Sequence, residues 1–550
     1  MFARCNRTLH NKGQSQDRKR YLMFVSIFND VIGPVMRGPS SSHCAAALRI
    51  GRLARDLMDG ELTDVLVEFD RNGSLATTHE SQGSDMGLFG GLLGWDAADE
   101  RLPGASQALR EAGVRVRIET VDTGDPHPNT YRLTLRNPRE QHSLIAISTG
   151  GGMIEIIEID GFKVSICGDY YETLVWVDGD GEAVVRELSE RVAADAILLH
   201  KSKNGQLVEV KADRFVDEQV LAGRKVKRLA PVLPVLSRAG MSVPFTTCAE
   251  MLRYDNGRGM PLWKLAVEYE KTRGNLTEPE VIRRMVEIVR ILRRSIAQGI
   301  AGTKYDDRIL GHQCGRFNEL MRAGRLLNGG ALNRIVLYAS ALMEVKSAMG
   351  VIVAAPTAGA CAALPAAVIA MAEEMNLDEE AMAKAMLAGG IIGVFIATHW
   401  TFAAEVGGCQ AEAGSASSMA AAALVTLANG TLAESVAAAS MALQNVIGLI
   451  CDPVANRVEV PCLGKNVMAA SNALACANMA LAGYDPVIPL DEVIDTAKRT
   501  SEQMPREFRC TALGGLSITP TSKALEKILA LRKSSGCNQC GTKQSEDKIP

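Results

Sequence analysis

The sequence predicts an α+β N-terminal domain followed by a large all-α domain. Residues 23–185 hold short, β-branched apolar runs separated by Gly, Asp, Pro or Asn, as in strands joined by turns. From residue 242 onward, apolar side chains recur at helical spacing and the strand pattern almost disappears. The chain has 550 residues, which is long enough for roughly two to four domains of about 150 residues each.

The first domain, residues 23–185, begins with a short apolar run at 23–28 and a helix at 46–57, where apolar residues have helical spacing. The next segment, LTDVLVEFD at 62–70, alternates between apolar and polar residues, as a half-buried strand does. Six further strands are expected at 114–120, 129–136, 143–147, 155–159, 162–166 and 172–177.

The all-α domain is expected over residues 239–530. Gly, Pro and Asn residues interrupt the pattern and leave helices of roughly 10–20 residues, the ordinary range for globular proteins. The same region is crowded with Ala, Gly and Met, which allows helices to approach closely. The expected helices lie at 260–271, 278–298, 336–349, 364–374, 379–387, 417–427 and 432–447.

Three segments fall outside these two domains. Residues 1–22 are rich in Arg and Lys and lack an apolar stretch, so they predict a disordered basic extension, with a transit peptide as the alternative. Residues 186–238 mix charges and lose a clear period, so a linker or a degenerate regulatory module is expected there. Residues 531–550 are expected to form a flexible tail.

The overall charge argues against several classes of partner. Lys and Arg number 60 against 63 for Asp and Glu, and the net charge of -3 points neither to nucleic acid nor to an anionic membrane. A small neutral or zwitterionic ligand fits this balance better. The 13 cysteines are scattered and odd in number, and the N-terminus does not resemble a secretory signal. We therefore expect a protein of the reducing cytoplasm.

Two long and nearly uncharged stretches, 351–372 and 386–404, resemble membrane spans at first sight. Pro356 and Pro365 interrupt the first, and the second contains His399. Neither stretch has the Leu, Ile and Phe density or the flanking Lys and Arg bias of a span. Buried helices of the all-α domain are expected instead, without a membrane-spanning segment.

Three cysteines stand in turn-like surroundings. Cys409 follows two glycines, Cys451 precedes Asp-Pro, and Cys462 follows a proline, with separations of 42 and 11 residues. Thiolates are the usual ligands of iron–sulfur clusters, and three thiolates leave one iron open to a substrate. The alternative is that each cysteine is a small buried hydrophobe, and their spacing does not exclude it. A zinc site would more often show a CxxC pair or histidine ligands.

Several motifs together resemble the bacterial iron–sulfur L-serine dehydratases, also called L-serine ammonia-lyases. The resemblance spans residues 23–530, with the family's β domain fused ahead of its α domain. The β-domain motifs are MFVSIFNDVIGPVMRGPSSSH at 23–43, SDMGLFGGLLG at 84–94 and GGGMIEIIEIDGF at 150–162. The α-domain motifs are PTAGA at 356–360, GCQAE around Cys409, CDPV at Cys451, VPC at Cys462 and ALGGLSITPT at 512–521.

The resemblance implies a [4Fe-4S] cluster ligated by Cys409, Cys451 and Cys462, whose fourth iron binds the substrate hydroxyl. The expected reaction is β-elimination of water from L-serine, with removal of the α-proton by a base and release of pyruvate and ammonia. Pyridoxal phosphate is not required. The small-residue helical surfaces also make a homodimer the expected assembly.

The substrate-binding residues implied by the resemblance come from two loops. Ser40, Ser41, Ser42 and His43 precede a helix, with Ser42 and His43 as catalytic candidates. An ordinary helix N-cap is the alternative for the serines. His43 has three open roles, as the base, as an orienting donor or as a structural donor. Thr357 and Gly359 belong to the α-domain loop that faces the cluster in the family.

The departures from the family concentrate around the expected pocket. His399 and Trp400 replace small polar residues before Cys409, and Lys346 replaces an amide. We therefore add His399 and Lys346 to the substrate-binding candidates, and we leave threonine, cysteine and bulkier relatives open as substrates. Other functional alternatives are a non-catalytic iron–sulfur sensor and a structural helical protein. Three further cysteines are candidate ligands of lower rank, namely Cys510, Cys537 and Cys540.

Overall fold

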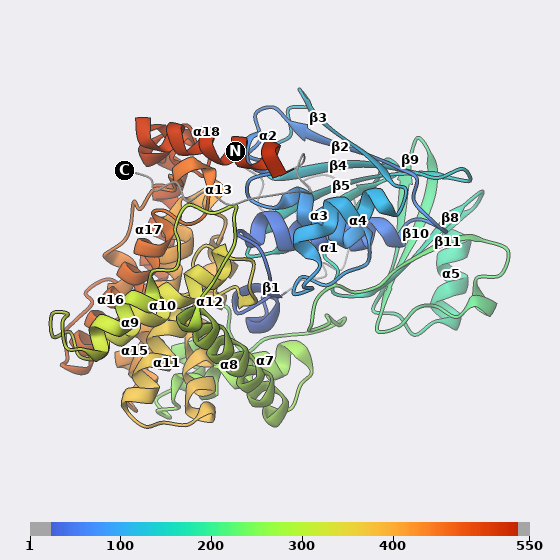
Figure 1. Ribbon diagram of the computed structural model, residues 1–550. Coiled ribbons are helices and arrows are strands. Elements are labelled where there is room, and N and C mark those ends of the chain that lie inside the picture. Colours follow the sequence, from blue (N-terminus) through green and yellow to red (C-terminus); the bar gives the residue numbers. More distant parts are fainter. Residues whose placement is uncertain (1–23, 537–550) are drawn as a thin grey trace.

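The computed structural model describes residues 24–536 and confirms the expected fold class (Figure 1). Two β-sheets and their helices form the N-terminal part, and a helix-rich part follows it. The basic extension 1–22, Cys537 and Cys540 lie outside the described residues. The start of the expected tail, up to Gly536, continues the last helix, α18 (Pro520–Gly536).

The larger sheet has six strands in the order β3-β2-β4-β5-β6-β7. All neighbours are antiparallel except the parallel pair of β2 and β3. Helices α1 (Ala46–Asp56), α3 (Ser84–Leu92) and α4 (Ala105–Glu111) share its hydrophobic core. Its strands are β2 (Asp64–Asp70), β3 (Arg115–Val121), β4 (Thr130–Arg136), β5 (Gln141–Gly150), β6 (Met153–Ile159) and β7 (Phe162–Ile166). Every strand expected between residues 62 and 166 is therefore confirmed.

Helices α1 and α3 cross at very short range. A Cβ atom at Gly91 would lie 2.1 Å from the carbonyl oxygen of Leu48, and one at Gly87 would lie 2.0 Å from that of Cys44. Only glycine allows such an approach between backbones. The contact at Gly87 fixes the segment that contains the four candidate residues Ser40 to His43.

Residues 186–238 are folded, so a linker is the wrong description of this segment. Its three strands join one earlier strand in a four-stranded antiparallel sheet of order β11-β8-β10-β9, and helix α5 (Gly181–Arg191) packs on β9 and β10. The expected boundary at residue 185 cuts through this helix. The four strands are β8 (Tyr171–Val177), β9 (Ala196–Ser202), β10 (Gly205–Ala212) and β11 (Lys225–Leu229).

The helical part contains all seven expected helices and several that the pattern did not indicate. The expected ones are α7 (Leu262–Gly274), α8 (Glu278–Ala301), α10 (Ala331–Ser347), α11 (Ala363–Glu374), α12 (Glu379–His399), α14 (Ser415–Leu427) and α15 (Leu432–Gln444). Also present are α6 (Cys248–Asp255), α9 (Cys314–Arg322), α13 (Ala404–Gly407), α16 (Cys462–Leu481) and α17 (Leu490–Gln503). The short helix α2 (Leu75–Thr78) belongs to the N-terminal part.

Helix α12 is the one described helix that is long and apolar enough to cross a bilayer. However, 78% of its most apolar 18-residue window is buried inside the protein. It packs against α7, α8 and α14. Burial among other helices explains its composition, as the sequence indicated.

The two parts of the chain interlock rather than follow one another. Strand β1 (Val35–Met36) pairs with β12 (Ile352–Val353) of the helical part. The π-helix η1 (Ile27–Val31) packs against α12, and its apolar side chains join the helical core. The expected apolar run at 23–28 therefore contributes to the second domain. The junction lies beside the candidate site.

Candidate active site

Candidate residues from both parts of the chain meet at this junction. Ser41 and Ser42 lie in the π-helix η2 (Ser41–Ala45), which continues into α1. The Ser41 hydroxyl accepts a hydrogen bond from the amide of Ala358 at 3.1 Å, and the Ser42 hydroxyl donates to Oε1 of Glu405 at 2.7 Å. These bonds join loops that are more than 300 residues apart in sequence. The side chain of Ser40, at the N-cap position, makes no capping bond.

The tautomer of His43 follows from its neighbours. Nε2 lies 2.8 Å from the hydroxyl of Thr78, which itself donates to the carbonyl of Ser74 at 2.7 Å. The Thr78 oxygen must therefore accept, so Nε2 carries the proton and Nδ1 keeps its lone pair. Nδ1 faces the hydroxyls of Ser40 at 3.0 Å and Ser42 at 3.2 Å.

His43 is fully buried, and burial lowers the pKa of its imidazole, although the negative charge of Glu405 opposes this shift. Its Nδ1 lies 3.4 Å from Oε1 of Glu405. The ring is therefore neutral at pH 7 and presents an unprotonated nitrogen. That state is the one that a general base requires.

Glu405 brings an unpaired acceptor into the same place. It is buried, and within residues 24–536 its Oε2 atom has no hydrogen-bond partner. Burial lowers the pKa of nearby His127 to about 4, against the opposing effect of the negative charge of Glu405. Both polar side-chain atoms of nearby Asn129 are also buried without a partner among the described atoms. Buried groups of this kind usually await a ligand or water.

Two of the three predicted cluster cysteines lie side by side. The Sγ atoms of Cys409 and Cys451 and a carboxylate oxygen of Glu412 are within 4.8 Å of one another. Cys409 precedes the π-helix η5 (Gln410–Gly414), and Cys451 pairs through its backbone with the strand-like segment at Phe508 and Cys510. Cys462 begins α16, is buried, and interacts electrostatically with Cys409.

Cys510, which the sequence analysis ranked below the three predicted ligands, also lies in this group of cysteines. Its backbone amide donates to the carbonyl of Cys451 at 3.2 Å, and its thiol interacts with that of Cys451. The side-chain amide of Gln82 lies 3.5 Å from its Sγ atom. A fourth thiol therefore adjoins the predicted ligands.

Lys465 supplies a positive charge at the cysteines. Its Nζ atom lies 3.5 Å from Sγ of Cys409 and 2.9 Å from a carboxylate oxygen of Asp452. The hydrogen bond from the Cys451 thiol, with Lys465 as a further cause, holds the pKa of Cys409 below its ordinary value against the effect of burial. Burial raises the pKa of Cys462. The donors are soft and buried beside a cation, which fits a thiolate-ligated iron–sulfur cluster.

Thr357 and Gly359 contact Glu412, whose carboxylate lies beside Cys409 and Cys451. The Thr357 hydroxyl donates to Oε1 of Glu412 at 2.6 Å. A Cβ atom at Gly359 would lie 2.8 Å from the same oxygen, so glycine makes room for the carboxylate. Burial, and then the charge at Cys409, raise the pKa of Glu412 to about 8.

Lys346 and His399, the two candidates chosen because they differ from the family's motifs, lie in different places relative to the cysteines. Lys346 is fully buried, donates to the carbonyl of Val458 and interacts electrostatically with Glu412 and Cys462. His399 ends α12, and its ring Nε2 lies 3.3 Å from the carbonyl of Thr246. In the described part of the chain, no contact brings His399 to the cysteines. The structure therefore brings Lys346 to the site and leaves His399 in a contact between the end of α12 and the loop before α6.

Sequence reasoning missed Glu405, Glu412, Thr78 and Asn129. The acidic pair had a readable signal, because Glu405 and Glu412 stand in a nearly uncharged stretch around Cys409. Thr78 and Asn129 gave no such signal. Their roles arise only from contacts across the fold.

Comparisons with known proteins agree with this arrangement. The family profile described as "Serine dehydratase alpha chain" matches residues 257–517. The probable L-serine dehydratase alpha chain of Bacillus subtilis is 39% identical over 263 residues, which cover 48% of this chain and 87% of that protein. The probable beta chain of the same organism is 36% identical over 207 residues, covering 36% of this chain and 92% of that protein.

A single-chain relative covers both parts. The L-serine dehydratase of Streptomyces coelicolor is 29% identical over 506 residues, which span 90% of this chain and 99% of that protein. The match to separate alpha and beta chains, and to one chain that combines them, agrees with the two interlocked parts of the fold.

Proposed function

Because this chain belongs to the serine dehydratase family, we propose that it is a [4Fe-4S]-dependent ammonia-lyase that converts L-serine to pyruvate and ammonia. The observation that carries the proposal is the meeting of His43, Glu405 and the cysteines at one buried junction. Cys409, Cys451 and Cys462 would hold the cluster. When bound, the cluster supplies an iron that acts as a Lewis acid toward the hydroxyl of the substrate.

His43 is the proposed base for the α-proton. Its Nδ1 atom lies near the hydroxyls of Ser40 and Ser42, and burial lowers its pKa, so the ring is unprotonated at neutral pH and available to take up the α-proton. Thr78 fixes the tautomer through Nε2. Loss of the α-proton and of the β-hydroxyl as water gives an enamine, which tautomerises and hydrolyses to the 2-oxo acid and ammonia.

The remaining polar groups suit the charges of an amino acid. The unpaired Oε2 of Glu405 is a proposed acceptor for the substrate ammonium, and Ser42 orients that carboxylate through Oε1. The buried charge of Lys346 favours a carboxylate in its vicinity. Trp400 is buried against Gly407, two residues before Cys409, and Phe402 is buried against Gly151; both occupy volume that small residues would leave free. A small substrate is therefore preferred over a bulky one.

Cys510 favours one second candidate function. A fourth thiolate beside Cys451 would complete the ligation of the cluster and leave no iron for substrate, as in an iron–sulfur sensor. The two functions predict different responses to serine. In a lyase, L-serine perturbs the visible and electron paramagnetic resonance spectra of the reconstituted protein, whereas in a sensor it perturbs neither.

The testing experiment uses the full chain reconstituted with iron and sulfide without oxygen. Cys409→Ser, Cys451→Ser and Cys462→Ser should each lose most of the visible charge-transfer absorption and the release of pyruvate from L-serine. Cys476→Ser is the matched control. Cys476, in α16, is also buried, but its thiol contacts the side chains of Asn445 and Asn472 rather than the other cysteines. Equal iron content and spectra in all four variants would contradict the ligand assignment.

A further inference from the structure

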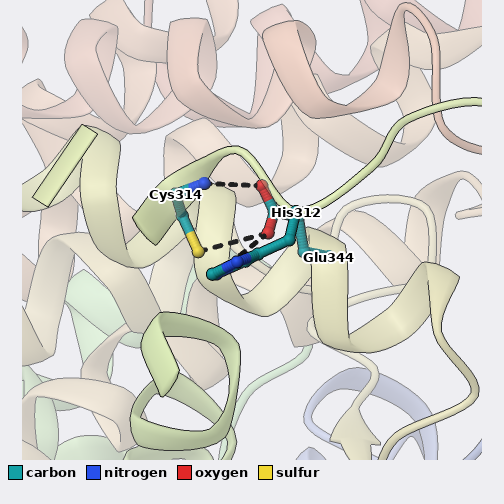
Figure 2. Close-up of side chains that lie close together, drawn as sticks. All are labelled: His312, Cys314 and Glu344. Atoms are coloured by element: carbon teal, nitrogen blue, oxygen red, sulfur yellow. Dashed lines mark hydrogen bonds and ion pairs between the residues drawn. The ribbon is translucent and has the colours of Figure 1, made fainter. Parts of the chain in front are cut away.

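We propose that His312, Cys314 and Glu344 form a zinc site outside the proposed active site. Figure 2 shows the three side chains converging on one point. His312 and Cys314 stand at the start of α9, Glu344 lies on α10, and each offers one ligand atom within 4.8 Å of the others. The inference does not depend on the proposed function.

The distances fit a tetrahedral ion. Sγ of Cys314 lies 3.2 Å from Oε2 of Glu344, and Nε2 of His312 lies 4.0 Å from the same oxygen. Zinc bonds of about 2.0–2.3 Å place ligand atoms about 3.3–3.5 Å apart. Small side-chain rotations therefore bring all three atoms into range. The carbonyl of Gly299 lies 3.0 Å from both Nε2 and Sγ and borders the same space.

The ligand types select the metal. One imidazole nitrogen, one thiolate and one carboxylate oxygen are ligands that zinc accepts, whereas calcium and magnesium prefer oxygen alone. Binding requires the Cys314 thiol to release its proton to solvent, and the His312 ring to carry its proton on Nδ1 rather than on Nε2, which now donates to Gly299. Three protein ligands leave the fourth position for water. The His312 side chain is 29% exposed, so an ion can enter from that side.

A helix cap is the alternative role for Glu344. Its Oε1 atom accepts hydrogen bonds from the amides of Gln313 and Cys314, both at 2.9 Å, and so caps α9. These bonds use Oε1 and leave Oε2 directed at the thiol and the imidazole (Figure 2). The cap therefore orients the carboxylate for a metal, as hydrogen bonds to metal ligands usually do.

Two neighbours keep the arrangement in place. A Cβ atom at Gly315 would lie 2.5 Å from Cε1 of His312, so the ring position requires glycine there. The preceding loop is bound to Glu459 through the amides of Ile309 and Leu310, at 2.9 and 3.0 Å. The site would therefore tie the start of α9 to α10, beside the segment that leads to Cys462.

Zinc content of the purified full chain tests the proposal. After dialysis against zinc and then against metal-free buffer, wild-type protein and Cys476→Ser should retain about one more equivalent of zinc than Cys314→Ser. All three proteins keep the cluster cysteines, so the difference isolates Cys314. Cobalt in place of zinc should give thiolate-to-metal absorption that Cys314→Ser lacks. Equal zinc content in wild type and Cys314→Ser would overturn the proposal.

A second variant covers the case in which Cys314→Ser does not fold. His312→Gln alters a partly exposed ring and keeps both the Cys314 thiol and the helix cap by Glu344. It should weaken zinc binding by more than about tenfold, because loss of a residue that only hydrogen-bonds a metal ligand already costs about that much. Removal of zinc with a chelator should lower the unfolding temperature of wild type and leave that of His312→Gln unchanged. If Glu344 is only a cap, the chelator changes neither protein, and the proposal fails.

Discussion

At the scale of single residues, the chemistry of the junction depends on which nitrogen of His43 carries a proton. Thr78 decides this, because its hydroxyl is already committed as a donor to Ser74 and can only accept from Nε2. The hydroxyl of Ser40 can then donate to the lone pair at Nδ1, whereas that of Ser42 is committed to Glu405. The tautomer of the proposed base is thus set by Thr78, a residue outside the proposed substrate-binding set.

Thr78→Val removes the acceptor for Nε2 at nearly constant volume. Without it the imidazole can take the other tautomer, so kcat for serine should fall by about a hundredfold while KM changes little. Steady-state kinetics measure both constants. Thr77→Val is the matched control, because the Thr77 hydroxyl also donates to Ser74 but is not bonded to His43. If both variants lose activity equally, Thr78 does not act through the tautomer.

The pH dependence of the reaction follows from the burial of His43. Burial disfavours the charged imidazolium, so the pKa of His43 lies below its ordinary value of 6.5 and the neutral base persists at lower pH. The acid limb of kcat/KM should therefore lie below pH 6.5, with full activity above that value. A pH profile of the reconstituted enzyme checks this expectation. An acid limb centred above pH 6.5 would contradict the assignment of His43 as the base.

At the scale of elements, the sequence revealed strands and helices where one period dominated. Strand β7 and helix α11 have almost the expected bounds, because alternation or helical spacing was uninterrupted. Strand β8 of the second sheet was expected, but its other three strands were missed because β9, β10 and β11 carry lysine, histidine and glutamate among their apolar residues. Several of those charges are buried in pairs, which no local pattern indicates. The roles of Thr78 and Asn129 could not be predicted either, because they depend on contacts between distant segments. The three cysteines could be predicted, because each lies in a recognisable motif.

Lys211 exemplifies such a buried charge in the second sheet. Its Nζ atom lies 2.8 Å from Glu172 and 2.7 Å from Glu209, and both carboxylates are fully buried. Lys211→Met would leave them without their cation, so the free energy of unfolding should fall by about 3–5 kcal/mol. Chemical denaturation measures this change. Lys201→Met, on β9 of the same sheet, breaks an exposed pair with Glu182 of α5 and should cost less than about 1 kcal/mol. Comparable losses in the two variants would contradict this account.

At the scale of the whole molecule, the N-terminal segment fastens one part of the chain to the other. The amide of Ile27 donates to Glu270 of α7 at 2.8 Å, and the hydroxyl of Ser26 bonds the same carboxylate at 2.5 Å. The hydroxyl of Tyr269, also on α7, donates to the carbonyl of Val25 at 2.8 Å. Because these contacts and the β1–β12 pair are buried, the two parts should associate without a covalent connection.

A chain split after Gly240, in an exposed turn, tests this expectation. The two pieces, expressed together, should copurify in equal amounts and reconstitute the cluster, since the junction rests on buried contacts between them. Glu270→Ala should weaken the complex by about tenfold or more, because it leaves the Ile27 amide and the Ser26 hydroxyl unsatisfied in a buried place. Glu268→Ala on the same helix, where Glu268 only pairs with Lys271, should have little effect. Pieces that elute separately, or a complex equally weakened by both substitutions, would show that the connection through residue 240 holds the parts together instead.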